Sequence, residues 1–213
     1  STITGATGAA TVTSAAVPVG SFDLSESGPA GYTASSWVCT GATGSTTASV
    51  TLGRADNAPC TSTNTAIAPT LTLVKQVVNN NGGTAEATAW TLSADGPTPI
   101  SGATGSTAVT GAVVEVGDYN LSETGPTGYT ASARNCGPAA LTGSTVTVPL
   151  GGNVTCTIVN TDQPALLTLV KVVDNGDTGA TATPADWTLS AAGSITVTGA
   201  GNSAEVTAQT VPA

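Results

Sequence analysis

The feature that most constrains the fold is a long internal repeat. The stretch DLSESGPAGYTAS, which begins at Asp23, returns as NLSETGPTGYTAS at Asn120, 97 positions later. The stretch LTLVKQVVNNNGG at Leu71 returns in the same way as LTLVKVVDNGDTG at Leu167. Because small domains of about 100 residues are common, this interval predicts one domain per repeat.

The chain holds one complete repeat and parts of two others. The first part lacks the beginning of a repeat, and the last part lacks the Gly-x-aromatic-x-Leu-x-Glu segment and everything after it. Short linkers that contain proline separate the parts and predict a semi-rigid array. The predicted divisions are 1–66 (the later part of a repeat), 67–70 (linker), 71–162 (complete repeat), 163–166 (linker) and 167–213 (the beginning of a repeat).

The partial repeats have two interpretations. The chain is an excerpt from a longer tandem array, or neighbouring molecules complete the terminal parts by exchanging strands. The excerpt is favoured, because residues 194–213 repeat a region that residues 2–19 already supply. The start of the chain also has no pattern of a signal peptide, which predicts a mature or excised segment.

The composition predicts an all-β fold. Only 8% of the residues are charged, against roughly 25% in an ordinary soluble domain. Thr, Ala, Gly, Ser and Val fill the difference, and stretches such as TLTLVK and STVTVP alternate in polarity with a period of two. This alternation is typical of half-buried antiparallel strands. We therefore expect tandem Ig-like or prealbumin-like antiparallel β-sandwich domains.

Charge and residue content exclude several functions. A net charge of −9 and a pI near 4.1 argue against nucleic acid and anionic membranes as partners. No apolar run approaches the roughly 18 residues of a spanning helix. The chain has no histidine and no glycine-rich phosphate loop before a helix, so we expect no catalysis on an external substrate and no cofactor.

The four cysteines predict disulfides. No CxxC pair is present, which argues against a zinc site and leaves no metal predicted. Cys39 and Cys60 occupy the same repeat positions as Cys136 and Cys156, so pairing within each repeat is the economical arrangement. Each closed loop of about 20 residues would add on the order of 3 kcal/mol. Disulfides indicate an oxidising, extracellular compartment.

Three polar residues occur at positions that should face the core. In LTLVK, YNLSE and CTIVN the last residue shares its strand face with the apolar residues two and four positions earlier, which places Lys75, Glu123 and Asn160 inward. Each would cost several kcal/mol to bury alone, so we expect the three to meet. The chain has two lysines, Lys75 and Lys171, and both occupy this one repeat position.

These motifs resemble the prealbumin-like, Cna B-type (SpaA-like) domains of Gram-positive surface proteins and pilins. The resemblance rests on LTLVK, on YNLSETGPTGY and on the closing CTIVNTD, and it covers all three parts. It implies an isopeptide bond between Lys75 and Asn160, with Glu123 as the proton shuttle. In the partial repeats Glu26, Asn64 and Lys171 are the equivalents of Glu123, Asn160 and Lys75. The first part has no lysine upstream of Glu26 and Asn64, and the last part has no glutamate downstream of Lys171.

Burial would favour this chemistry by disfavouring the charged forms of the lysine and the glutamate. An uncharged amine is a nucleophile, and a protonated carboxyl can polarise the carboxamide and protonate the departing ammonia. The alternatives left open are a hydrogen-bonded ion pair without a covalent bond, and a lysine that extends to solvent at the sheet edge.

Two other motifs have ordinary explanations that we favour. DNGDTG at Asp174 has the oxygen side chains of a calcium loop, but its counterpart NNNGG lacks the acids, so a hairpin turn is expected. Trp90 and Trp187 could stack on a sugar, but their matching places in the strand motif WTLSA predict core positions.

The leading functional hypothesis is a structural stalk or filament of an extracellular bacterial protein, on the cell surface or secreted. Its partners would be flanking repeats or copies of itself. The alternative is an adhesin module that binds a host protein or glycan through its loops.

Overall fold

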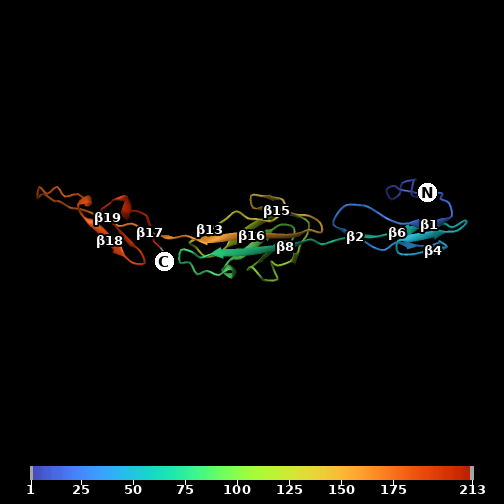
Figure 1. Ribbon diagram of the computed structural model, residues 1–213, viewed down its shortest axis with the longest axis horizontal. Helices are drawn as coiled ribbons and strands as arrows, with labels where there is room; N and C mark the ends of the chain where they lie inside the picture. Colours follow the sequence, from blue (N-terminus) through green and yellow to red (C-terminus); the bar gives the residue numbers. More distant parts are fainter. Residues whose placement is uncertain (1, 212–213) are drawn as a thin grey trace. The chain divides into compact units, whose positions relative to one another are not determined.

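The computed structural model describes residues 2–211 and confirms the all-β expectation. It divides into two compact units, one up to Pro69 together with Pro149–Gly152, the other made of Thr70–Val148 and the residues from Asn153 onwards. The regular secondary structure of each unit is mainly strand (Figure 1). The described helices are three single 3₁₀ turns, Ala87–Ala89, Pro184–Asp186 and Ala204–Val206.

The complete repeat has two facing sheets. The first has the order β11-β8-β16-β13, formed by Ala112–Val113, Thr70–Val78, Asn153–Asp162 and Tyr129–Ala131. The second has the order β10-β9-β12-β15-β14, formed by Ile100–Gly102, Thr91–Asp95, Gly117–Thr124, Thr145–Val148 and Leu141–Thr142.

One strand pair differs from the antiparallel expectation. The first and last strands of the repeat, β8 and β16, lie side by side and run parallel, with Thr70 opposite Asn153 and Val78 opposite Thr161. A parallel pair needs a long crossover connection, and here the remaining strands of the repeat supply it. The alternation of inward and outward residues along one strand cannot reveal the direction of its neighbour. A strand buries the same alternate residues whether the neighbouring strand is parallel or antiparallel.

The core lies between the two sheets and follows the predicted alternation. Leu71 and Leu73 of β8 are buried, and so is Lys75 at 3% exposure. The facing strands bury their own alternate residues, among them Tyr119, Leu121, Val146, Val148, Val154, Cys156 and Ile158. The predicted inward face of each strand is therefore confirmed, the lysine included.

Residues 20–66 form strands that correspond to β12–β16. Their ranges are Gly20–Asp23 (β1), Tyr32–Ala34 (β2), Val38–Cys39 (β3), Gly44–Ser45 (β4), Ser49–Leu52 (β5), Cys60–Thr61 (β6) and Asn64–Ala66 (β7). The pairing of β1 with β5 and of β2 with β7 has the same register as that of β12 with β15 and of β13 with β16.

Residues 165–211 form strands that correspond to β8–β11. Their ranges are Ala165–Leu167 (β17), Thr188–Ala192 (β18), Thr196–Ala200 (β19) and Gln209–Val211 (β20). β17 pairs with β20 in the register of β8 with β11, and β18 pairs with β19 in the register of β9 with β10.

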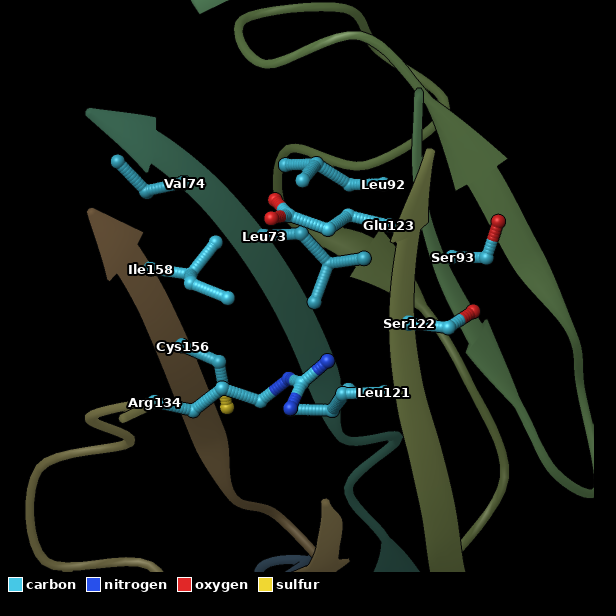
Figure 2. Close-up of a pocket in the computed structure, with 10 residues that line it drawn as sticks. All are labelled: Leu73, Val74, Leu92, Ser93, Leu121, Ser122, Glu123, Arg134, Cys156 and Ile158. Atoms are coloured by element: carbon cyan, nitrogen blue, oxygen red, sulfur yellow. The ribbon is translucent and has the colours of Figure 1, made fainter. Parts of the chain in front are cut away.

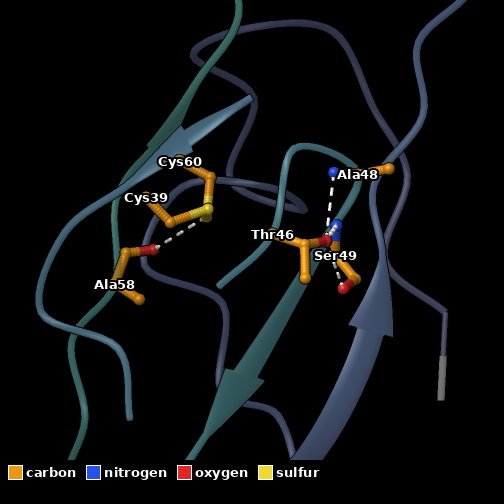
Figure 3. Close-up of a disulfide and its surroundings, with 6 residues drawn as sticks. All are labelled: Cys39, Thr46, Ala48, Ser49, Ala58 and Cys60. Carbon is orange, nitrogen blue, oxygen red and sulfur yellow. Dashed lines mark hydrogen bonds between the residues drawn. A yellow bond between two sulfur atoms is a disulfide. The ribbon is translucent and has the colours of Figure 1, made fainter. Parts of the chain in front are cut away.

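Two disulfides join the cysteines that the sequence pairs. Cys136 is bonded to Cys156 inside the core of the complete repeat, and Cys39 is bonded to Cys60. Figure 3 shows the second bridge near the turn between β4 and β5, where the Thr46 hydroxyl accepts the N–H groups of Ala48 and Ser49. The bridges tie β16 and β6 to the loop and strand that precede them.

The close approach of Trp90 to Gly125 gives a first prediction. A Cβ atom on Gly125 would overlap the indole ring of Trp90, whereas a Cβ atom on Gly28, at the same repeat position, would meet nothing within 4 Å. Gly125→Ala should lower the free energy of unfolding of the complete repeat by about 1–3 kcal/mol through overpacking. Gly28→Ala is the matched control and should have little effect. Equal effects of the two changes in urea titrations would contradict this packing.

Candidate cross-linking site

Glu123 brings Lys75 and Asn160 together in the core. The Lys75 Nζ atom donates to Glu123 Oε2 at 2.6 Å, and Asn160 Nδ2 donates to Glu123 Oε1 at 2.9 Å. Lys75 on β8 and Asn160 on β16 belong to one sheet, and Glu123 reaches them from β12 in the facing sheet. The expected meeting of the three residues is therefore present, with the carboxylate between the amine and the carboxamide.

The site is closed to solvent on the lysine side. The Lys75 side chain has no accessible surface, Asn160 is 4% exposed and the Glu123 side chain 12%. The Trp90 ring covers the amine, with its centroid 5.0 Å from Nζ, and the ring of Tyr129 packs edge-on against Trp90 at 5.1 Å. The alternative of a lysine that extends to solvent is thus wrong for Lys75.

Burial lowers the pKa of Lys75 below its ordinary value of 10.5. The hydrogen bond and the charge of Glu123 oppose this shift, and the positive charge of Arg134 reinforces it. Loss of water stabilisation disfavours an ammonium ion unless a partner compensates fully. The environment therefore moves the lysine toward the neutral amine, the form that can attack a carbonyl carbon.

A small pocket opens between the sheets beside Glu123. Figure 2 shows the Glu123 carboxylate pointing into the intersheet space near Leu73 and Leu92, while Arg134 reaches across toward Leu121. Sequence reasoning missed Arg134, because it precedes the bridged cysteine in a segment without strand periodicity. Its effect on Lys75 depends on a contact that only the fold creates.

The carboxamide of Asn160 has an unsatisfied atom. Its Oδ1 is buried and accepts no hydrogen bond from the residues that the structure describes. A buried acceptor without a partner costs about 1–3 kcal/mol. If the Lys75 proton moves to Glu123 and the amide turns over, the new carboxyl O–H can donate to this oxygen. The turn gives Oδ1 a partner but moves Nδ2 to the place where no described residue offers one, so one atom of the carboxamide stays unpaired in either form.

Asp162 holds the loop after β8 against the end of β16. It is 3% exposed, and its carboxylate accepts the N–H groups of Asn80, Asn81 and Gly83 at 2.7–2.9 Å. Burial acts to raise the pKa of Asp162, but the bonds from the loop outweigh it and hold the pKa below 3.8. Asp162 lies two positions after Asn160 and therefore on the same inward face of the strand. This position could have identified Asp162 from the sequence.

This loop clamp predicts a pH dependence. A carboxyl group whose pKa is depressed by folding stabilises the protein above its unfolded pKa and loses this effect as the pH falls through the folded value. The contribution of Asp162 should be complete above pH 3.8 and decline below it. In thermal melts of Asp162→Asn, the melting temperature should therefore fall less steeply than that of the wild type as the pH is lowered below 3.8. Asp95→Asn, which removes one carboxylate from an exposed position on β9, is the control, and its melts should show a steeper acid limb than those of Asp162→Asn.

The partial repeats each hold a share of the same arrangement. In the first, Asn64 Nδ2 donates to Glu26 Oε2 at 3.1 Å, and both residues are exposed. In the last, Lys171 Nζ lies 4.6 Å from the centroid of the Trp187 ring, as Lys75 lies over Trp90. Trp187 is 37% exposed against 2% for Trp90, because no facing sheet covers it among the described residues from 163 to 211.

The segment DNGDTG forms a local turn, in which Asp174 accepts the N–H of Gly176. The expected hairpin is not formed, because no strands flank this turn among the described residues. Among residues 2–211 no three acidic, cysteine or histidine side chains gather closely enough to hold a metal ion. Within the same residues no helix has the length and hydropathy to cross a membrane.

Comparison with known proteins agrees with the motifs and the fold. Searches of the curated proteins and of the solved structures give no match. A family model described as a prealbumin-like fold domain (SpaA_2) matches residues 1–62, 67–158 and 162–213, which is nearly the whole chain. The resemblance inferred from LTLVK, YNLSE and CTIVN is thereby confirmed, and the chain belongs to the SpaA-type family of prealbumin-like fold domains.

Proposed function

We propose that this chain is a load-bearing segment of an extracellular bacterial stalk or filament, and that its complete repeat is locked by a self-formed isopeptide bond between Lys75 and Asn160. Membership of a family of surface and pilin-type structural modules supports the structural role. Two disulfides support an oxidising location outside the cell.

The observation that carries the proposal is the position of the Glu123 carboxylate. It contacts the amine of Lys75 through one oxygen and the amide nitrogen of Asn160 through the other. An ion pair alone would need only the first contact. A carboxyl that touches both groups can take a proton from one and deliver it to the other.

The reaction proceeds in balanced steps. Glu123 first accepts a proton from the Lys75 ammonium, which leaves a neutral amine and a carboxylic acid. The amine nitrogen then attacks Cγ of Asn160, forming the new C–N bond while the acid hydrogen-bonds to the carboxamide oxygen. The proton released by the attacking nitrogen passes through Glu123 to Nδ2, and the old C–N bond breaks to release ammonia. Fixed positions replace collision, so no separate enzyme is required.

The mechanical consequence follows from the parallel pairing of β8 and β16. The chain enters the repeat at Thr70 and leaves it at Asp162, at opposite ends of two adjacent parallel strands. A pull on the ends loads their hydrogen bonds in shear. A bond from Lys75 to Asn160 would transmit the load directly from one strand to the other. The residues between them would then lie outside the path of force.

Single-molecule stretching of the 213-residue chain tests this function. The wild-type complete repeat should show no unfolding step, whereas Glu123→Ala should add one. The step would release the residues between Lys75 and Asn160 except those inside the closed Cys136–Cys156 loop. These are about 65 residues, or roughly 220 Å at about 3.4 Å per residue. A step of this length in the wild-type chain would sink the proposal.

A further inference from the structure

Arg134 is the basic residue that the complete repeat retains when Lys75 has reacted. The basic residues of the chain are Arg54, Lys75, Arg134 and Lys171, so residues 71–162 contain only Lys75 and Arg134. An isopeptide bond converts the Lys75 amine into a neutral amide. A carboxylate that stays in the core then depends on Arg134 for a nearby positive charge.

The backbone on both sides of Arg134 is fixed to β16. The next residue, Asn135, exchanges two backbone hydrogen bonds with Thr157, at 2.8 and 2.9 Å. On the other side, the N–H of Ser132 donates to the carbonyl of Val159 at 2.8 Å. The side chain of Arg134 therefore starts from a fixed position beside the space between the two sheets.

The guanidinium of Arg134 shares a pocket with the Glu123 carboxylate. Both line the small pocket between the sheets, where Figure 2 shows Arg134 reaching toward Leu121 and Glu123 pointing into the same space. Arg134 is half-buried, and among residues 2–211 it forms no ion pair and its guanidinium donates no hydrogen bond. Glu123 is the only acid among the described residues that line this pocket.

The charge of Arg134 already acts on the cross-linking site. Burial is the main cause of the lowered pKa of Lys75, and the positive charge of Arg134 adds to it. The other charge that acts on this amine is that of Glu123. The guanidinium therefore lies close enough to respond when the charge of Lys75 is lost.

The other charged groups around β12 are turned outward or engaged elsewhere. Asp118 of β12 and Asp95 of the neighbouring β9 are exposed and alternate with buried residues. The neighbouring β15 carries no charged residue. On the facing sheet Asp162 is inward, but its carboxylate accepts the N–H groups of the loop after β8. Once Lys75 has reacted, Arg134 is the cation available to Glu123.

We propose that Arg134 becomes the counter-ion of Glu123 when the Lys75–Asn160 bond has formed, and that it thereby lets Glu123 give up the proton taken from Lys75. This role rests on the proposed function. At the end of the steps described above, Glu123 is a carboxylic acid beside a molecule of ammonia. The proton passes from the acid to the ammonia, which leaves as ammonium, and the carboxylate stays with the guanidinium.

The exchange of partners has a physical reason on each side. Burial without a counter-ion favours the neutral acid, whereas a positive charge within about 4–6 Å favours the carboxylate. An arginine keeps its charge at every pH at which the chain is folded. Because the guanidinium ends a flexible side chain in the same pocket, it can turn toward Glu123 without a backbone movement. Arg134 acts through Glu123 and is a positioning residue.

Nuclear magnetic resonance of the whole cross-linked chain, with isotope-labelled glutamate carboxyls, tests this role. In the wild type the Glu123 carboxyl should be ionised at neutral pH. Arg134→Gln should raise the pH at which this carboxyl titrates by at least about one unit, which is a tenfold change in its acid dissociation constant. Arg134→Lys keeps the charge and should titrate closer to the wild type. The signals of the exposed Glu86 and Glu115 should not change.

Arg54→Gln is the matched control, because it removes the same charge from an exposed position in the other unit. It should titrate like the wild type. Equal titration of Glu123 in the wild type and in Arg134→Gln would overturn the proposal. A protonated Glu123 at neutral pH in the cross-linked wild type would overturn it as well, and this result decides the question even where Arg134→Gln does not fold or cross-link.

Intact mass separates this proposal from the proposed function. A wild-type chain with its full mass has no cross-link, which would contradict the proposed function and the role of Arg134 with it. A wild-type chain that has lost one ammonia but holds a neutral Glu123 would leave the proposed function standing and overturn the role of Arg134.

Discussion

Glu123→Gln is expected to leave the complete repeat without its cross-link and to lower its free energy of unfolding by at least about 4 kcal/mol. The Lys75–Asn160 bond would close a loop of roughly 85 residues, for which chain-entropy estimates give about 4–5 kcal/mol. Glutamine has nearly the same shape but cannot accept the lysine proton. The substitution also leaves Lys75, which has no accessible side-chain surface, beside a neutral amide.

Thermal melts and hydrogen exchange of β8 and β16 measure this effect. Glu115→Gln is the matched control, because Glu115 is exposed and the change removes the same charge from the same repeat. The control should melt with the wild type. Coincident melting of the Glu123 and Glu115 variants would contradict a role for Glu123 in stability.

Replacing both Cys136 and Cys156 by serine is expected to cost about 3 kcal/mol through the lost loop closure alone. The packing loss adds to this, since both cysteines are 3% exposed and belong to the core cluster. The bonded cysteines are separated by 20 residues in the sequence and fix the loop before β14 to the centre of β16. Hydrogen exchange in β16 should therefore accelerate strongly.

The matched control is the double serine variant of Cys39 and Cys60. This pair has a separation of 21 residues, so the loop-closure effect is nearly the same. Both cysteines are only half-buried, so the packing loss should be smaller, and the exchange of β16 should not change. If the two double variants lowered stability equally, packing of the buried bridge would contribute nothing.

Strand periodicity made much of the site predictable. LTLVK, YNLSE and CTIVN each place a polar residue on an apolar face, and a buried lysine, glutamate and asparagine have few partners other than one another. Cysteines at matching repeat positions gave the disulfides for a similar reason. The cost of burial left few arrangements for the three polar residues, and the repeat interval left one economical pairing for the cysteines.

Other features depend on contacts between segments far apart in sequence. The parallel pairing of β8 with β16 does not change which alternate residues of either strand face inward, so the sequence pattern cannot reveal it. Trp90, which precedes β9, covers Lys75 of β8 only because the two sheets face each other, and Arg134 approaches the site through a segment without periodicity. Trp187, expected in a core, is partly exposed because a core needs a second sheet and not only a strand motif.

The burial of Lys75 connects the fold with the proposed chemistry. One arrangement of β8, β12 and β16 removes water from the amine, lowers the pKa of Lys75 and aims a carboxyl at both reacting groups. The same arrangement places the bond between the first and last strands, where a pull would be applied. The proposed structural role and the proposed cross-link would thus be two consequences of one geometry.

The most direct test is the intact mass of the 213-residue chain after complete reduction of its disulfides, followed by peptide mapping. We expect a mass lower than that of the sequence by one ammonia in the monomer, with Lys75 and Asn160 recovered in a single branched peptide. Glu123→Gln should restore the full mass of its own sequence. A wild-type monomer with the full mass, yielding separate peptides for Lys75 and Asn160, would contradict the account and leave the three residues as a buried polar cluster.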